Sequence, residues 1–443
     1  MNFSEWFTKS LGYGFSFIVV IMFLRNFIPF AIAYAPLVIG ASAVAIVVSV
    51  RRFNPRLFSV PKPTKSDIIP FVPSLIIALV GLLYFQAFPI FPQFLSADFS
   101  QHADLLRAIL SNQSFAIDGQ VLKFAYLYLL AVPLAFFHTT LASPIPLVQI
   151  RIEMMVMVAL SPYFVYLASY KLFESHRIAW MTSLFYALSG FVWFGMVFNS
   201  GLYSNFYGVL ASLFLIAVAK DFVVKKLGFL SLFPLVLAII NAYVSHYSTL
   251  FAILISAAYL LTFAKREWLL KRGILGASLI TVPIPLGFVA LPNVAQILFG
   301  FLGSGSASPF ITSGHPTFIP QYLYQWNPFL SNFIFLFAND YFTLAMLLLL
   351  AVFGVIALLR RSIPLLVLLG WFALVATTSS LNASTWRLAF VSFVPVTLMS
   401  GYLLGNLVDL KKQVFKRQFL LVCVLGFLFF NSWTAHATSD SFI

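Results

Sequence analysis

Residues 203–219 read YSNFYGVLASLFLIAVA, an almost unbroken apolar run that stops at Lys220. Apolar runs of 15–22 residues recur along the whole chain, and roughly 20 such residues cross a bilayer as an α-helix. The chain is 61% hydrophobic and 9% charged, whereas a soluble domain carries about 25% charged residues. The runs are continuous rather than alternating, which argues against a transmembrane β-barrel. The sequence therefore predicts an all-α, polytopic transmembrane bundle that forms a single domain over residues 1–443.

The positive charge lies between the apolar runs. The formal net charge is +14, and most Lys and Arg residues fall in six short loops. These loops cover residues 51–65, 171–177, 220–225, 265–272, 360–361 and 411–417. This distribution follows the positive-inside rule of membrane proteins, so we expect no nucleic-acid partner. The single cysteine, Cys423, lies inside an apolar run and excludes a disulfide or thiolate-metal framework.

Thirteen apolar runs are candidate spans. They cover residues 12–30, 32–50, 68–88, 148–170, 178–198, 203–219, 228–245, 248–264, 273–292, 340–359, 363–378, 387–405 and 418–431. With these spans every basic loop falls on the cytoplasmic side of the cell membrane, with the N-terminus inside and the C-terminus outside. This topology requires that residues 124–140, which contain Pro133, do not cross the whole membrane. We therefore expect that segment to be interfacial or re-entrant.

Two large outer loops follow from this topology, over residues of about 89–147 and 293–339. The second contains Gly303-Ser304-Gly305-Ser306, a composition typical of a loop. A long loop of this kind is a lid or binding loop in some proteins and a disordered connector in others. Both interpretations of the second loop stay open.

The first outer loop holds a polar island at residues 96–107, with two of the chain's 12 acids. Ionisable groups are costly beside lipid, so such a cluster is a functional candidate. The pattern suits an amphipathic helix lying on the membrane. On such a helix Asp98 and His102 share a face, and Asp104 pairs with Arg107. Alternatively, Asp98 only caps the helix. Asp98, His102 and Asp104 can also hold a divalent metal ion, although three such residues are a weak indication.

Two further residues are candidates on the predicted outer side. His246 lies between two spans with almost no loop; the alternative is a histidine satisfied by neighbouring hydroxyls. Arg387 lies at the outer start of the penultimate span. Its guanidinium suits a phosphate, and the alternative is snorkelling to the interface. No Walker loop, dinucleotide-binding fingerprint or zinc motif occurs, so ATP hydrolysis, nicotinamide chemistry and structural zinc are unsupported.

Taken in chain order, these features resemble the GT-C class of integral-membrane glycosyltransferases, which use polyprenyl-phosphate-linked sugars. ADFSQH at residues 97–102 is similar to the Asp-x-x-x-His motif of that class. Arg151 before an apolar run resembles its Arg-led helix, and residues 201–206 resemble its short outer turn. Residues 386–390, WRLAF, resemble its late Arg-led helix, which contacts the lipid phosphate. The chain departs from the class in having two spans before the one that leads into the first loop. It also shows no large C-terminal soluble domain.

The resemblance implies a glycosyltransferase that acts at the extracytoplasmic membrane face. It implies Asp98 as the catalytic base, since transfer requires deprotonation of an acceptor hydroxyl. It further implies His102, Asp104 and His246 as substrate-binding residues and Arg387 as the group that holds the lipid phosphate. The expected partners are membrane lipids and a polyprenyl-phosphate sugar. Whether a divalent metal ion binds as a cofactor stays open.

Two other functions stay open. A transporter or flippase of lipid-linked substrates would require ionisable residues inside the membrane. Few charges fall inside the apolar runs, Arg25 being the clearest, which disfavours that function. The other possibility is a non-catalytic subunit with the same fold.

Overall fold

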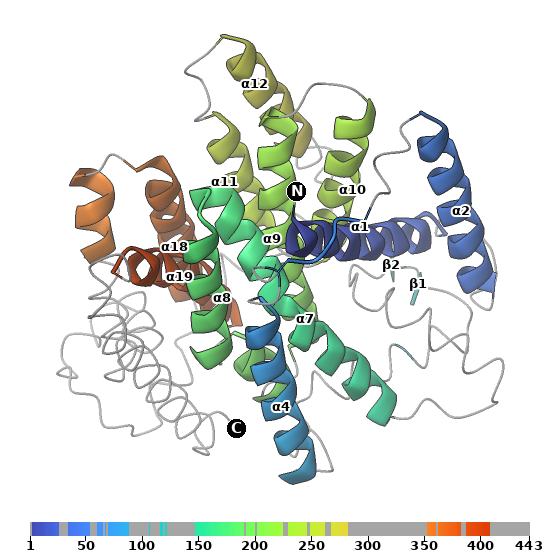
Figure 1. Ribbon diagram of the computed structural model, residues 1–443, viewed down its shortest axis with the longest axis horizontal. Coiled ribbons are helices and arrows are strands. Elements are labelled where there is room, and N and C mark those ends of the chain that lie inside the picture. Colours follow the sequence, from blue (N-terminus) through green and yellow to red (C-terminus); the bar gives the residue numbers. More distant parts are fainter. Residues whose placement is uncertain are drawn as a thin grey trace.

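The chain is almost entirely helical wherever the structure describes it (Figure 1). The computed structural model describes residues 2–25, 34–53, 60–64, 67, 70–87, 106, 116–117, 120–121, 147–189, 192–199, 202–224, 229–245, 249–261, 267–281, 352–359, 362–381 and 387–407. The exception to the helices is a minimal antiparallel ladder between β1 (Ala116–Ile117) and β2 (Gln120–Val121). For these residues the predicted helical class is confirmed.

The helices follow the predicted apolar runs. They are α1 (Phe3–Leu24), α2 (Ala35–Phe53), α4 (Phe71–Ala87), α7 (Leu147–Phe173), α8 (His176–Ser189), the π-helix η3 (Phe194–Asn199), α9 (Tyr203–Val224), α10 (Phe229–Ser245), α11 (Thr249–Leu261), α12 (Glu267–Thr281), α18 (Ile363–Leu381) and α19 (Arg387–Leu407). Among the described residues, three stretches are long and apolar enough to cross a membrane: Phe3–Leu24, Ile152–Phe173 and Tyr203–Val224. These stretches support a membrane location, while the total of thirteen spans stays a prediction.

Several predicted boundaries were wrong. The first helix begins at Phe3 rather than at residue 12, and α12 begins at Glu267 rather than at residue 273. The run 178–198 is divided, because α8 ends at Ser189 and η3 follows as a separate π-helical turn. Residues 124–140, 293–339 and 418–431 lie outside the described part of the chain.

Helix α9 is the centre of the bundle. It contacts α7, α10, α11 and α12, and its side chains are buried from Tyr203 to Val223 apart from half-buried Lys220. A helix that is apolar all round is expected in such a position. Figure 1 shows α1 lying across the middle of the bundle, while α2 stands at one edge.

Helices α8 and α19 pack closely through small residues. Gly401 and Gly405 of α19 lie four residues apart and therefore on one face. A Cβ at Gly405 would lie 2.8 Å from the Cα atom of Ile178, and one at Gly401 would meet Thr182. Small residues with this spacing let helix backbones approach each other in membranes. Because Ile178 and Thr182 lie near the start of α8, the two helices run antiparallel.

Backbone groups inside the bundle find local partners. Pro162 lacks an N–H group, so the carbonyl of Val158 has no helical donor. The Ser161 hydroxyl donates to that carbonyl at 2.6 Å. Such side-chain compensation is what allows proline within a helix surrounded by lipid.

Candidate functional site

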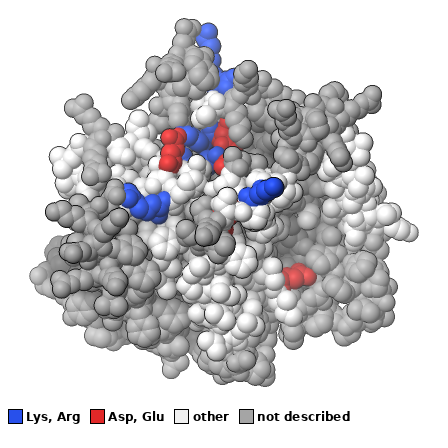
Figure 2. All heavy atoms as spheres, viewed as in Figure 1, with Lys and Arg blue, Asp and Glu red and all other residues white. Residues whose placement is uncertain are grey.

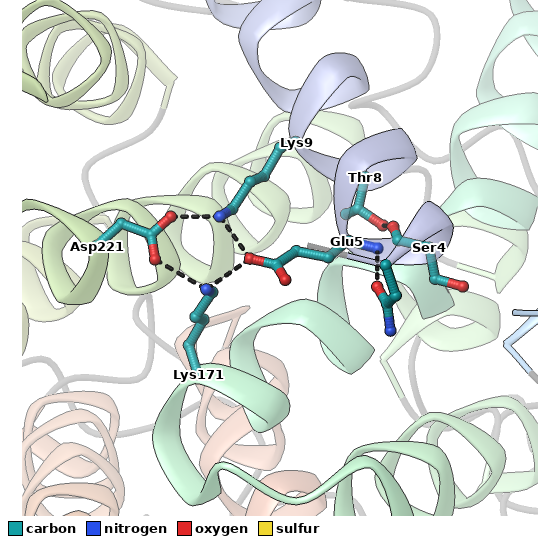
Figure 3. Close-up of polar contacts among 7 residues, drawn as sticks. Ser4, Glu5, Thr8, Lys9, Lys171 and Asp221 are labelled. Atoms are coloured by element: carbon teal, nitrogen blue, oxygen red, sulfur yellow. Dashed lines mark hydrogen bonds and ion pairs between the residues drawn. The ribbon is translucent and has the colours of Figure 1, made fainter. Parts of the chain in front are cut away.

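The main polar feature of the described residues is a ring of four charged side chains, called here the ion quartet: Glu5, Lys9, Lys171 and Asp221. Lys9 Nζ lies 2.6 Å from Glu5 Oε1 and also contacts Asp221. Lys171 Nζ lies 2.6 Å from Glu5 Oε1 and 2.8 Å from Asp221 Oδ1. Figure 3 shows both ammonium groups between the two carboxylates. The quartet therefore joins α1, α7 and α9 and carries no net charge.

Because the quartet is buried, its positive and negative charges must balance. The four side chains are only 6–13% exposed. Removing such charges from water costs several kcal/mol for each ion, and only close opposite charges offset this cost. Each carboxylate here contacts both lysines, so every charge has two opposite neighbours. Ionisable residues inside membrane helices typically face the bundle interior and pair in this way.

The quartet explains why α1 begins earlier than predicted. Its buried face is small and polar, with Ser4, Thr8, Gly12 and Ser16 beside the charged pair Glu5 and Lys9. The buried side chains become apolar only toward the end of the helix, at Val19, Val20 and Met22. This inward polar face is the reverse of a soluble amphipathic helix, and it suits a helix whose outer side meets lipid.

A second carboxylate fixes the first turn of α1. Asp67 Oδ1 accepts from the backbone N–H of Ser4 at 3.0 Å and from its hydroxyl at 3.1 Å. Asp67 Oδ2 accepts from the Thr64 hydroxyl at 2.6 Å. Burial acts to raise the pKa of Asp67, but the hydrogen bonds from Thr64 and Ser4 outweigh burial and hold the pKa below its ordinary value. The carboxylate thus satisfies a free N–H group of the helix terminus.

More contacts surround the quartet at the same end of the bundle. Lys220 Nζ lies 3.0 Å from Glu174 Oε1. Glu174 directly follows α7 and has a left-handed backbone at φ 53. Arg272 of α12 donates to the Val223 carbonyl at 3.4 Å. On the face drawn in Figure 2, blue and red side chains lie side by side in a group above the centre, and single charged side chains lie elsewhere on the same face. We call this part of the bundle the quartet end.

Hydrogen bonds between α9, α10 and α11 define the opposite end, called here the far end. The Tyr207 hydroxyl donates to Asn241 Oδ1 at 2.9 Å, which joins the start of α9 to the last turns of α10. The Thr249 hydroxyl donates to the Ala242 carbonyl at 2.6 Å, so α11 begins beside the end of α10. Because Asp221 holds the other end of α9 in the quartet, these contacts lie at the far end.

The directions of α4 and α19 relative to the quartet end and the far end follow from their contacts. Helix α4 follows Asp67, which contacts α1 at the quartet end, and it runs along α7 and α8 toward Ala87. The last turns of α19 contact the start of α8 at the quartet end. Gly401 lies 14 residues after Arg387, roughly 21 Å along a helix. Arg387 therefore begins α19 toward the far end.

The predicted site residues are mostly outside the described part of the chain. Asp98, His102, Asp104 and His246 all fall there, and of Arg387 only the backbone position is described. Within the predicted interfacial helix the structure describes Leu106, which is helical and buried. No group of three or more metal-ligating side chains occurs among the described residues. The metal suggested for Asp98, His102 and Asp104 stays a prediction.

The quartet was not among the sequence predictions. Lys171 had been placed in a basic loop expected to face the cytoplasm, and Glu5, Lys9 and Asp221 had not been singled out. Arg25 is indeed buried, but the quartet adds four charges that are largely inaccessible. The available signal was the spacing of Glu5 and Lys9, one helical turn apart and next to an apolar run. Their partners Lys171 and Asp221 are too distant in sequence for any local pattern to connect them.

Comparison with known proteins adds no further assignment, because no protein family, curated protein or solved structure matches the sequence.

Proposed function

We propose that this protein is a glycosyltransferase that moves a sugar from a polyprenyl-phosphate-linked donor to an acceptor at the extracytoplasmic membrane face. The observation that carries the proposal is the direction of three helices. Helix α4 runs toward the far end and precedes Asp98 in the sequence. Helix α10 ends there at Ser245, the residue before His246, and α19 begins toward the same end at Arg387. The described helices that flank three distant candidates in the sequence thus share one end of the bundle.

The charges of the bundle support this assignment of sides. The quartet end carries Lys171, Lys220 and Arg272, which belong to three of the basic segments that the positive-inside rule assigns to the cytoplasm. The far end would then face the other side of the membrane, where cytoplasmic sugar nucleotides are not available. A lipid-carried sugar is the donor that can reach a site at that boundary.

The chemistry requires a base and a group that stabilises the leaving phosphate. In the proposed reaction, the Asp98 carboxylate accepts the proton of the acceptor hydroxyl. The hydroxyl oxygen forms the new bond to the sugar C1 atom as the bond from C1 to the phosphate oxygen breaks. The bonding pair leaves with the polyprenyl phosphate, whose charge Arg387 stabilises. His102, Asp104 and His246 are proposed to orient the substrates.

The ion quartet does not favour the transporter alternative. A transporter is expected to bind its substrate or coupling ion near the middle of the membrane. Lys171 and Asp221 lie within the last turn of α7 and of α9, respectively, and Glu5 lies in the first turn of α1. The quartet is also internally neutral, so it offers no unpaired charge to an ion. These features indicate that it connects helices.

The test of this function is the Asp98→Asn variant. Purified protein is incubated with radiolabelled polyprenyl-phosphate sugars and a membrane extract that supplies the acceptor, and release of polyprenyl phosphate is measured. Asn keeps the shape of the side chain and can still cap a helix, so we expect unchanged thermal stability. Loss of a positioned base lowers the rate by about 10²–10⁴-fold.

The control is Glu174→Gln, which removes an exposed carboxylate at the quartet end, outside the proposed site. Its ion pair with Lys220 contributes roughly 0–1 kcal/mol, so we expect release at the wild-type rate. Equal rates for the wild type and Asp98→Asn would remove Asp98 from the reaction. Absence of release by the wild type with every donor would contradict the proposed function itself.

A further inference from the structure

The side chain of Asn205 is buried without a partner for its amide donor. Asn205 is the third residue of α9 and is 2% exposed. Its Nδ2 atom makes no hydrogen bond. Its Oδ1 atom has a long contact of 3.5 Å with the neighbouring Ser204 hydroxyl. Buried polar groups are nearly always satisfied, so an exception in a native structure calls for an explanation.

A second buried asparagine shows what the usual arrangement looks like. Asn241 is 3% exposed, and its Oδ1 atom accepts from the Tyr207 hydroxyl at 2.9 Å. Asn205 forms no such bond and makes no capping hydrogen bond to the backbone among the described residues. An apolar side chain of similar size would fill the same space without an unsatisfied donor. Other buried atoms without a partner occur among the described residues, for example Trp180 Nε1 and Trp371 Nε1. A ligand with an acceptor oxygen would satisfy the Asn205 amide.

The position of Asn205 indicates where that ligand lies. Tyr207 and Asp221 lie on the face of α9 that contacts α10, α1 and α7. Residues two apart lie about 200° apart around a helix, so Asn205 lies on the opposite face from Tyr207. Lys220, fifteen residues after Asn205, lies about 60° from it around the helix. Lys220 contacts Tyr259 of α11 at 3.4 Å and Glu174, which follows α7, at 3.0 Å. Asn205 thus lies at the far end, on the face of α9 away from α10.

The chemistry of the far end indicates what kind of ligand it is. Residues 203–219, 229–245 and 249–261 contain no charged side chain. The polar groups described near this end of α9, α10 and α11 are hydroxyls and amides, accompanied by tyrosines. The preceding η3 is a π-helix, a conformation that is frequent at functional sites. Neutral donors beside aromatic rings suit a hydroxyl-rich, uncharged group, whereas a phosphate would require cations.

We propose that the Asn205 amide hydrogen-bonds the sugar of the lipid-linked donor, while the phosphate lies apart from it. This inference rests on the proposed function and adds a residue that recognises the sugar. Asn205 is a binding residue in this account and takes no part in proton transfer.

The experiment compares Asn205→Leu with Asn241→Leu as the matched control. Binding of two probes in detergent is measured: polyprenyl phosphate alone, and polyprenyl phosphate carrying mannose, glucose or N-acetylglucosamine. For Asn205→Leu we expect a thermal unfolding temperature at or above the wild-type value, because an unsatisfied donor is removed. We expect binding of the sugar-bearing probe to weaken about tenfold or more and binding of polyprenyl phosphate to stay unchanged. Asn241→Leu should unfold at a lower temperature.

Three results would overturn the inference. If Asn205→Leu lowers the unfolding temperature as much as Asn241→Leu, the amide has a structural role. If Asn205→Leu binds the sugar-bearing probe like the wild type, the amide does not contact the sugar. The third result concerns the wild type. If it binds every sugar-bearing probe no better than polyprenyl phosphate, and releases polyprenyl phosphate from none of them, the proposed function fails and this inference fails with it.

Discussion

Replacing Asp221 by asparagine should be among the most destabilising single changes in the described core. The carboxylate of Asp221 contacts both lysines of the ion quartet, Lys171 at 2.8 Å and Lys9. Asn keeps the shape of the side chain but removes its charge. Glu5 then remains with two ammonium groups, and the quartet carries one uncompensated positive charge in a nearly buried position.

The size of the effect follows from these contacts. Two unit charges about 4 Å apart attract each other by roughly 4 kcal/mol at an effective dielectric constant of about 20. Asp221 has two such neighbours, and the asparagine oxygen recovers part of the loss as neutral hydrogen bonds. Breaking a buried ion pair by removing one partner typically costs about 3–5 kcal/mol. We expect a loss of this size in the free energy of unfolding.

The assay is unfolding of the purified protein in detergent micelles with increasing SDS, followed by circular dichroism. The control is Glu174→Gln, which removes a carboxylate from the ion pair with Lys220 at the same end. Because Glu174 is 73% exposed, its loss should cost at most about 1 kcal/mol. The double variant Asp221→Asn/Lys171→Met restores neutrality and should be more stable than Asp221→Asn. If Asp221→Asn is as mild as Glu174→Gln, the quartet does not hold α1 to the bundle.

Three further predictions concern packing, acid stability and the far end. Gly401→Ala should lower the free energy of unfolding by about 1–3 kcal/mol, because the new Cβ atom meets Thr182. Gly370→Ala is the control: its new Cβ atom would have no neighbour within 4 Å, so the change should be neutral or slightly stabilising. SDS titration of both variants measures the difference. The pKa of Asp67 lies below its ordinary value of 3.8, so the stability it contributes is present above that value and is lost as the pH falls through the lower, folded-state pKa. Asp67→Asn should remove this part of the acid dependence in thermal unfolding measured from pH 7 downward. Tyr207→Phe leaves a buried amide oxygen without its donor and should cost about 1–3 kcal/mol, again measured by SDS titration.

The sequence predicted the helices where apolarity alone determines them. The predicted span 203–219 and the helix Tyr203–Val224 share their first residue, and the predicted span 228–245 differs from α10 by one residue at its start. The prediction failed at α1, because the first span was taken to begin at residue 12 and so left Glu5 and Lys9 outside it. A single charged residue in a sequence suggests exposure to solvent. Glu5 and Lys9 are buried because each also pairs with a residue more than 160 positions away, Lys171 and Asp221 respectively.

The candidate site shows a different limit. Local sequence identifies Asp98, His246 and Arg387 as unusual polar residues among apolar runs, but it contains no distances between them. The unsatisfied amide of Asn205 could not be predicted from the sequence either, although residues 201–206 had been noted as a turn. Whether a buried asparagine is satisfied depends on its neighbours in space, which for Asn241 is Tyr207, 34 residues away.

The central claim is that the quartet end and the predicted site lie on opposite sides of the membrane. Single cysteines in a Cys423→Ser background, at Glu174 and at Ser100, test it directly with a membrane-impermeant maleimide. Glu174 is exposed at the quartet end, and Ser100 follows Asp98 in the sequence. We predict that Ser100→Cys is labelled in intact cells and that Glu174→Cys is labelled only after the membrane is permeabilised. Labelling of both cysteines from the same side would contradict the account.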